Sequence, residues 1–325
     1  MSNLLDKASI ILTPTAYNTS EVLCVKPSDG TGDFDFSRAT EATRINSLGL
    51  VETIGINLPR INYEGGCGSW LFEPQSTNLY LNSETLSTQT ITTTANQYSV
   101  SFYGTGTITF SGTHTGSLTG TGLNDRVTAT FTATSGTLTS TISGTVTKAQ
   151  IEQLNYATSY IPTSGSTVTR NQDLCTNGGS LASINSSEGV LYFEGSTLVN
   201  GGENRIISLS DGTSNNLIYL RIDSTASRFR GFARGSGGSY NIITVNGINQ
   251  TNNNKVALVW DATDFKIYIN GVFKTSATIN NLPLGLNQLK IEKQTGGDIF
   301  FGNTKCVAVW KEALTDAELI SLTTL

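Results

Sequence analysis

The sequence predicts an all-β protein, from its composition and from the alternation of its side chains. Only 14% of its 325 residues are charged, whereas an average globular domain carries about a quarter. Thr, Val, Ile, Tyr and Phe dominate over the helix formers, which favours strands. Several segments alternate apolar and polar residues with period two, as half-buried strands do. The net charge of −5 leaves no basic field for nucleic acid, and the apolar content is too high for a disordered tail.

Residues 1–84 contain short motifs separated by turn signals such as Asp29-Gly30 and Leu48-Gly49. Their periodicity is poor, which favours an extended arm with short strands over a compact domain. Such an arm buries little surface by itself. We therefore expect it to pack against a partner protein or another copy of the chain.

Residues 85–170 predict a Thr-rich β-sandwich. Asp125 and Arg126 are the only charged residues between Glu84 and Lys148. In residues 127–132, Val, Ala and Phe share one parity and Thr the other, as expected for an antiparallel strand with one buried face. The Thr stripes are expected to face solvent or, alternatively, a neighbouring subunit.

Residues 181–325 predict a second β domain, which follows a Ser/Gly/Asn-rich connector. Asn270-Gly271 is a strong hairpin signal because type I′ turns need positive φ at both central residues. Thr315 and Glu318 form a capping box that opens a short helix over residues 316–322, the only good helix that the sequence predicts. Strands are expected at 190–194, 205–209, 217–223, 227–233, 255–260, 265–269 and 288–292.

The sequence lacks the motifs of common catalytic sites, so we expect no enzymatic activity. The single histidine, His114, lies in a Thr/Gly strand with no acidic residue near it in sequence. Asp261 and Asp264 flank a predicted turn, where capping is favoured over a glycosidase carboxylate pair or a Ca²⁺ site. No other cluster suggests a ligand set, so no cofactor or metal is expected.

The cysteines Cys24, Cys67, Cys175 and Cys306 are widely scattered and form no C-x-x-C pair. Isolated, reduced, buried thiols are therefore favoured over disulfides or a zinc site. The N-terminus lacks the long apolar run of a secretory signal. No segment approaches the roughly 20 apolar residues of a membrane span. We expect synthesis in the cytoplasm without membrane insertion.

Aromatic and arginine residues supply the candidates for ligand recognition. Trp260 and Trp310 end apolar runs and are expected in the core rather than on a sugar-binding platform. Arg228 and Arg230 share a strand face opposite Phe229, so their guanidinium groups should project outward. An ordinary solvated face is the alternative. The candidate glycan-binding residues are Tyr219, Arg221, Arg228, Arg230 and Tyr240.

Several N-terminal motifs resemble a module of tailed-phage and prophage virion proteins. They are Leu5-Asp6-Lys7-Ala8, Pro27-Ser28-Asp29-Gly30, Phe36-Ser37-Arg38-Ala39-Thr40, Thr43-Arg44-Ile45-Asn46-Ser47, Gly49-Leu50-Val51-Glu52 and the run from Leu71 to Leu79. Residues 97–170 resemble the carbohydrate-binding-module-like jelly roll found in such proteins. Residues 188–325 are similar to concanavalin-A-like, laminin-G-type sandwiches, on the marks Trp260-Asp261-Ala262-Thr263, Ile269-Asn270-Gly271 and the ending from Trp310 to Leu319.

The resemblance implies a phage virion structural protein, as a tail or head fibre, spike or decoration subunit, and we expect the chain to form homotrimers. The N-terminal region would dock onto other virion proteins, and the C-terminal sandwich would bind host surface polysaccharide. The acid motif of the glycosidase branch has no match. Two rivals remain: a glycan depolymerase that uses the C-terminal sandwich, and a purely architectural capsid or tail component without a ligand.

Overall fold

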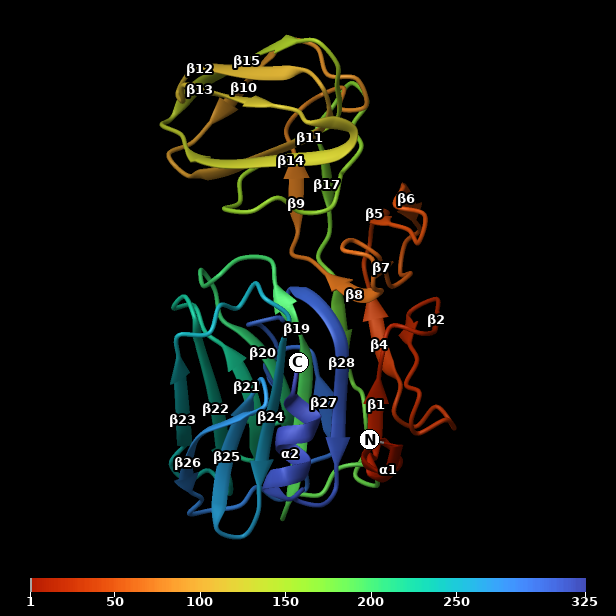
Figure 1. Ribbon diagram of the computed structural model, residues 1–325, viewed down its shortest axis with the longest axis vertical. Helices are drawn as coiled ribbons and strands as arrows, with labels where there is room; N and C mark the ends of the chain where they lie inside the picture. The colour runs from red at the N-terminus through yellow and green to blue at the C-terminus, as the bar shows by residue number, and fades with distance from the viewer. Residues whose placement is uncertain (1) are drawn as a thin grey trace.

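The computed structural model describes residues 2–325 and confirms the all-β class. Its strands form a small sandwich and a larger one, which Figure 1 shows one above the other. The described residues contain two short helices, α1 (Ser2–Lys7) and α2 (Asp316–Thr323). The first of these was not expected from the sequence.

The large sandwich packs an eight-stranded sheet against a five-stranded sheet. Side chains of both sheets, such as Leu191 and Leu258 from the first and Ile218 and Leu220 from the second, form one buried core. The first sheet has the order β26 (Val272–Thr278), β25 (Asp264–Ile269), β24 (Asn254–Trp260), β19 (Gly189–Thr197), β28 (Gly302–Trp310), β8 (Ser69–Phe72) and β7 (Ile61–Asn62), and β1 (Ile10–Leu12) also pairs with β28. The second has the order β23 (Asn241–Asn246), β22 (Arg228–Arg234), β21 (Leu217–Ile222), β20 (Arg205–Ser210) and β27 (Gln288–Lys290).

The N-terminal region is not an extended arm, which corrects the expectation for residues 1–84. β1 and β8 both pair with β28, and Figure 1 shows the N-terminal strands along the side of the large sandwich. Ile10 and Trp70 are completely buried there. These strands give hydrogen-bond partners to the backbone of β28 and cover the core at that edge. Residues 1–84 therefore contribute to the same body as the C-terminal strands.

The remaining N-terminal strands form three smaller sheets. One sheet has the order β18 (Leu174–Thr176), β4 (Phe34–Ser37), β3 (Glu21–Val22) and β2 (Tyr17–Asn18). β5 (Ala42–Ile45) and β6 (Val51–Ile54) form a hairpin beside the junction of the two sandwiches. β9 (Ser76–Asn78) and β17 (Val168–Arg170) pair where the chain enters and leaves the small sandwich.

The small sandwich has the Thr pattern that the sequence predicts. In β14, Val127 and Phe131 are partly buried against the core, whereas Thr128 and Thr130 are exposed. Its two sheets have the orders β10 (Gln89–Thr93), β15 (Gly136–Ser143), β12 (Thr107–Gly112), β13 (Gly116–Thr119) and β14 (Gly122–Thr132), β11 (Gln97–Gly104), β16 (Val146–Glu152).

Local signals in the large sandwich are confirmed closely. Asn270 and Gly271 have φ values of 53° and 77°, and they join β25 to β26 as the predicted tight turn. All three tryptophans are buried. Two strands were missed, β23 and β28. In β23 the neighbouring Ile242 and Ile243 point to opposite faces, so two adjacent apolar residues hide the alternation.

The four cysteines are free, but their burial differs from the expectation for one of them. Cys24 and Cys175 are buried, Cys306 is partly buried and Cys67 is exposed. Burial raises the pKa of the Cys24 thiol to about 12, so that thiol stays protonated at neutral pH. The prediction of buried thiols is therefore wrong for Cys67.

The capping box at the start of α2 leads to a first prediction. The Thr315 hydroxyl accepts a hydrogen bond from the Glu318 N–H, and the Glu318 carboxylate accepts one from the Thr315 N–H. Thr315→Ala is expected to lower the free energy of unfolding by about 1 kcal/mol, measured by chemical denaturation. Ser321→Ala on the exposed side of the same helix is the control. Equal losses in both variants would contradict the role of the cap.

Candidate functional site

The five candidate residues from the sequence gather on the outer face of the five-stranded sheet. Phe229 points into the core between the sheets, so Arg228 and Arg230 project from the other side, as predicted. In the register of β21 and β22, Arg221 lies opposite Arg230 and Tyr219 opposite Phe232. We call this surface the arginine face; it consists of Tyr219, Arg221, Asp223, Arg228, Arg230, Phe232, Arg234 and Tyr240.

Asp223 holds three arginines together on the arginine face. Its carboxylate lies 2.7 Å from Arg221 Nη2, 2.5 Å from Arg228 Nη2 and 3.6 Å from Arg230 Nε. Burial opposes ionisation of Asp223. The Thr225 N–H and the guanidinium groups outweigh it and lower the pKa to about 2. Arg234, which lies 4.8 Å from the Tyr240 ring centroid, adds a fourth guanidinium group to the face, so its members carry more positive than negative charge.

Aromatic rings extend the arginine face toward β23. Tyr219 and Phe232 stack with centroids 4.5 Å apart, and Tyr240 meets Phe232 edge to face at 6.1 Å. The Arg221 guanidinium lies 4.7 Å from the Phe232 ring centroid. Tyr219 is only 7% exposed, which corrects its expected exposure, whereas Tyr240 is 41% exposed. Tyr240 is thus the accessible ring.

The sequence analysis missed Asp223, Phe232 and Arg234 as members of this face. Phe232 and Arg234 continue the parity of Arg228 and Arg230 along β22, and this period-two signal was sufficient to find them. The role of Asp223 depends on its contacts with two strands. The sequence did not indicate that Asp223 is buried between arginines of β21 and β22.

The arginines that contact Asp223 remain partly accessible on the arginine face. The Nε atoms of Arg221, Arg228 and Arg230 are buried, so the outer ends of these side chains are the parts open to a ligand. The three side chains are between 19% and 26% exposed. Guanidinium groups held in place in this way offer planar, directional donors for oxygen atoms of a ligand.

A second group of charges lies buried where the two sandwiches and the N-terminal strands meet. Asp173 contacts Arg38 at 2.9 Å and Arg60 at 2.5 Å, and Glu73 contacts Arg60 at 2.7 Å and Arg170 at 2.9 Å. All five side chains are at most 2% exposed. We call them the buried ion network. Two members, Arg38 and Glu73, belong to motifs that the sequence analysis singled out.

The buried ion network connects parts of the chain that are far apart in sequence. Ser159, in the loop after β16, donates hydrogen bonds to Glu73 from its hydroxyl and its N–H, each at 2.6 Å. Thus the strand segments before the small sandwich are tied to the segment after it. Burial opposes ionisation of Glu73, but Arg170, Arg60 and Ser159 lower its pKa to about 2. The motifs therefore build the junction between the two sandwiches.

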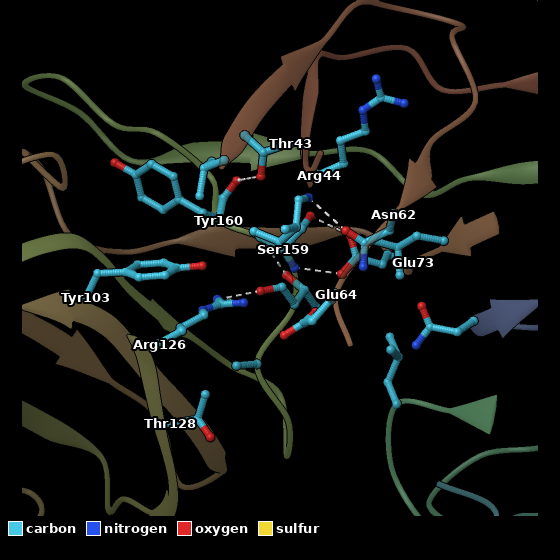
Figure 2. A pocket seen from close by; sticks show the side chains of 17 residues that line it. Thr43, Arg44, Asn62, Glu64, Glu73, Tyr103, Arg126, Thr128, Ser159 and Tyr160 are labelled. Atoms are coloured by element: carbon cyan, nitrogen blue, oxygen red, sulfur yellow. Dashed lines mark hydrogen bonds between the residues drawn. The ribbon is translucent and has the colours of Figure 1, made fainter. Parts of the chain in front are cut away.

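A pocket of about 260 Å³ opens beside this junction. Figure 2 shows Thr43, Arg44 and Asn62 on one side of it and Tyr103, Arg126 and Thr128 on the other. Its wall thus combines the β5–β6 hairpin, the small sandwich and the large sandwich. Sequence reasoning offered no signal for it because the lining residues come from separate segments.

The other candidate groups have structural roles. His114 is partly buried and stacks on Phe131 with centroids 4.2 Å apart. Asp261 Oδ1 accepts hydrogen bonds from the N–H groups of Thr263 and Asp264, each at 2.8 Å, which confirms turn capping. Within residues 2–325, no three or more His, Cys, Asp and Glu side chains are grouped to hold a metal. No helix there is long and apolar enough to cross a membrane.

Comparison with known proteins identifies the fold of the large sandwich. Residues 196–320 match the family model Laminin_G_3, described as the concanavalin A-like lectin/glucanases superfamily. The C-terminal sandwich is a concanavalin-A-like domain. This confirms the predicted fold of that part of the chain. Among curated proteins, none matches the sequence.

Solved structures with a similar arrangement include sugar-binding and toxin domains. A carbohydrate-binding module (CBM40) of a Ruminococcus gnavus sialidase, bound to α2,3 sialyllactose, is 18% identical, with a TM-score of 0.39 over 46% of this chain and 94% of that chain. The K499G mutant of Streptococcus pneumoniae NanB sialidase is 14% identical, with a TM-score of 0.39 over 46% and 28%. The botulinum neurotoxin serotype G binding domain is 15% identical, with a TM-score of 0.35 over 46% and 39%.

Proposed function

We propose that the protein is a non-catalytic glycan-binding protein whose arginine face binds an acidic saccharide. The observation that carries this proposal is the convergence of Arg221, Arg228 and Arg230 on Asp223, with each arginine side chain between 19% and 26% exposed. A lectin-type sandwich supplies the scaffold. Arg221, Arg228 and Arg230 lie on strands rather than on loops, so these donors are held rigidly.

The chemistry of the face suits a sugar carboxylate. Guanidinium groups bind carboxylates through paired, charge-assisted hydrogen bonds. Tyr240, which is 41% exposed beside Phe232, offers a ring on which the C–H face of a sugar packs. Since Asp223 already orients the arginines, little side-chain entropy is lost on binding. The expected ligand is therefore a glycan that contains uronic or sialic acid residues.

Charge removal tests this proposal. The double variant Arg228→Gln/Arg230→Gln is expected to bind a uronic-acid oligosaccharide at least about tenfold more weakly than the parent protein, since charge-assisted hydrogen bonds are lost. Calorimetric titration measures the affinity. The same oligosaccharide after carboxyl reduction should also bind the parent protein about tenfold more weakly than the acidic form does.

Lys266→Gln is the matched control, because it removes a cation from β25 in the opposite sheet. This variant should bind like the parent protein. Equal binding of the acidic and the carboxyl-reduced oligosaccharide would contradict recognition of the carboxylate. A shortened oligosaccharide after incubation would instead favour the depolymerase alternative.

We also propose that the chain is a structural subunit of a tailed-phage particle and forms trimers. The support is the resemblance of the N-terminal motifs to virion proteins. The β5–β6 hairpin adds exposed apolar residues, Leu48 at 80% and Leu50 at 55%, which suit contact with another protein. Imaging of particles with and without this chain tests the assignment. A chain that purifies as a stable monomer in light scattering would contradict the trimer.

A further inference from the structure

The pocket at the junction of the sandwiches has the size and position of a ligand site. Its volume of about 260 Å³ lies near the lower end of ligand pockets, which are typically about 300–1,000 Å³. A single sugar ring is a ligand of this size. Because three parts of the fold line the pocket, its shape depends on the assembled protein and not on one loop.

One wall of the pocket is organised before any ligand binds. Arg126 Nη2 donates to Ser101 Oγ at 2.7 Å and to the Thr158 carbonyl at 2.6 Å, which fixes the guanidinium group. Arg126 Nε is buried without a hydrogen-bond partner among the described residues. Ser159, which lines the same pocket, is held by the carboxylate of Glu73. Figure 2 shows the hydrogen bonds between Ser159 and Glu73 beside the pocket.

The other walls supply both donors and acceptors. The Asn62 side-chain oxygen accepts a hydrogen bond from the Ile45 N–H, so its amide nitrogen is the group left for a ligand. Burial raises the pKa of Tyr103, so its hydroxyl stays protonated and able to donate. Glu64 and Thr128 are exposed side chains that line the same pocket. Such a mixture matches hydroxyl groups, which donate and accept at once.

The charges of the pocket favour a neutral ligand. Arg44 is paired with Glu52 at 2.8 Å. Glu64 contributes a negative charge that faces the Arg126 side in Figure 2. A ligand carboxylate would meet Glu64, whereas hydroxyl or acetamido groups would not be repelled.

We propose that this junction pocket is a second carbohydrate site, which binds one neutral hexose or N-acetylhexosamine residue. The Tyr103 hydroxyl and the Asn62 amide donate to ring oxygens and hydroxyls, and Glu64 and Thr128 accept from hydroxyls. The site is separate from the arginine face and takes a different class of sugar. Its occupation does not depend on the function proposed for that face.

Saturation-transfer NMR and titration with methyl hexosides and methyl N-acetylhexosaminides test the proposal on the full chain. At least one of these neutral probes is expected to bind with millimolar or better affinity. Thr128→Val keeps the strand geometry and removes one hydroxyl, and Tyr103→Phe removes another. Each variant is expected to weaken binding about two- to tenfold, the usual effect of one hydrogen bond.

Thr128→Tyr places a bulky side chain at the exposed rim and is expected to abolish binding without disturbing the core. Arg228→Gln/Arg230→Gln is the matched control and should bind the neutral probe like the parent protein. Absence of binding by every neutral probe would overturn the proposal. So would neutral binding that Thr128→Tyr leaves intact, or binding lost in the arginine-face control.

Discussion

Replacement of Glu73 by glutamine is expected to lower the free energy of unfolding by about 3–5 kcal/mol, the usual effect of breaking a buried ion pair. Glu73 contacts Arg60 at 2.7 Å and Arg170 at 2.9 Å, and its side chain is 2% exposed. Without the charge of Glu73, the buried Arg170 guanidinium loses its carboxylate partner and Arg60 keeps only Asp173. Thermal and chemical denaturation of Glu73→Gln measure the loss.

Glu52→Gln is the matched control for this variant. Glu52 pairs with Arg44 at 2.8 Å, but its side chain is 42% exposed. Solvent screens such a pair, so the expected loss is at most about 1 kcal/mol. Similar losses in the two variants would show that the buried ion network does not hold the junction of the sandwiches.

The buried ion network also makes the free energy of unfolding depend on pH. The pKa of Glu73 is about 2 in the folded protein, below its ordinary value. A lowered carboxyl pKa gives stability that is present above the ordinary pKa and is lost as the pH falls toward the folded value. Denaturation of the parent protein should therefore become easier between about pH 5 and pH 2. Glu73→Gln should show a smaller change over this range.

Trp70→Ala is expected to lower the free energy of unfolding by about 3–5 kcal/mol, as large-to-small changes of a buried aromatic residue do. Trp70 is completely buried, lies on β8 opposite Thr304 of β28, and packs edge to face on Tyr17 at 6.1 Å. Because β8 belongs to the eight-stranded sheet, the loss should lower the melting temperature of the whole large sandwich. Circular dichroism during heating measures it.

Leu48→Ala is the control for Trp70→Ala. Leu48 belongs to the same N-terminal region but is 80% exposed. Its replacement should change the free energy of unfolding by less than about 0.5 kcal/mol. If Trp70→Ala were equally mild, the N-terminal strands would be an independent arm after all, as the sequence suggested.

The two proposed sugar sites lie on different parts of the fold and differ in charge. The arginine face is a strand surface where Asp223 is the one carboxylate among four guanidinium groups. The junction pocket is concave, and its arginines are accompanied by Glu52 and Glu64. A glycan that contains both acidic and neutral sugar residues could bind both sites, with an acidic residue at the arginine face and a neutral residue in the junction pocket. Variants at one site with the other intact separate the two contributions.

Local patterns allowed much of the fold to be predicted. Alternation along β14 and β22 identified strands and the outward direction of Arg228 and Arg230. Asn270-Gly271 and the Thr315 cap were predicted because their chemistry is confined to a few adjacent residues. The candidate site was found in part for the same reason, since Arg228 and Arg230 follow one parity along β22.

Contacts between residues far apart in the chain could not be predicted from the sequence. Ile10 pairs with Val309, and Arg38 contacts Asp173, although nothing adjacent to either residue indicates its partner. The motifs around Arg38 and Glu73 stood out in the sequence, but only their contacts with Asp173, Arg60 and Arg170 showed that they join the sandwiches.

The sequence by itself determined the all-β class, the uncharged Thr-rich sandwich, the turns and the cap of α2. Each follows from the spacing of neighbouring side chains and from backbone preferences that act over a few residues. The tertiary structure alone decided that the N-terminal strands complete the large sandwich, that Asp223 gathers three arginines, and that a pocket opens at the junction. Burial, charge compensation and concave shape depend on residues far apart in the chain, and local periodicity carries no information about which distant residues meet.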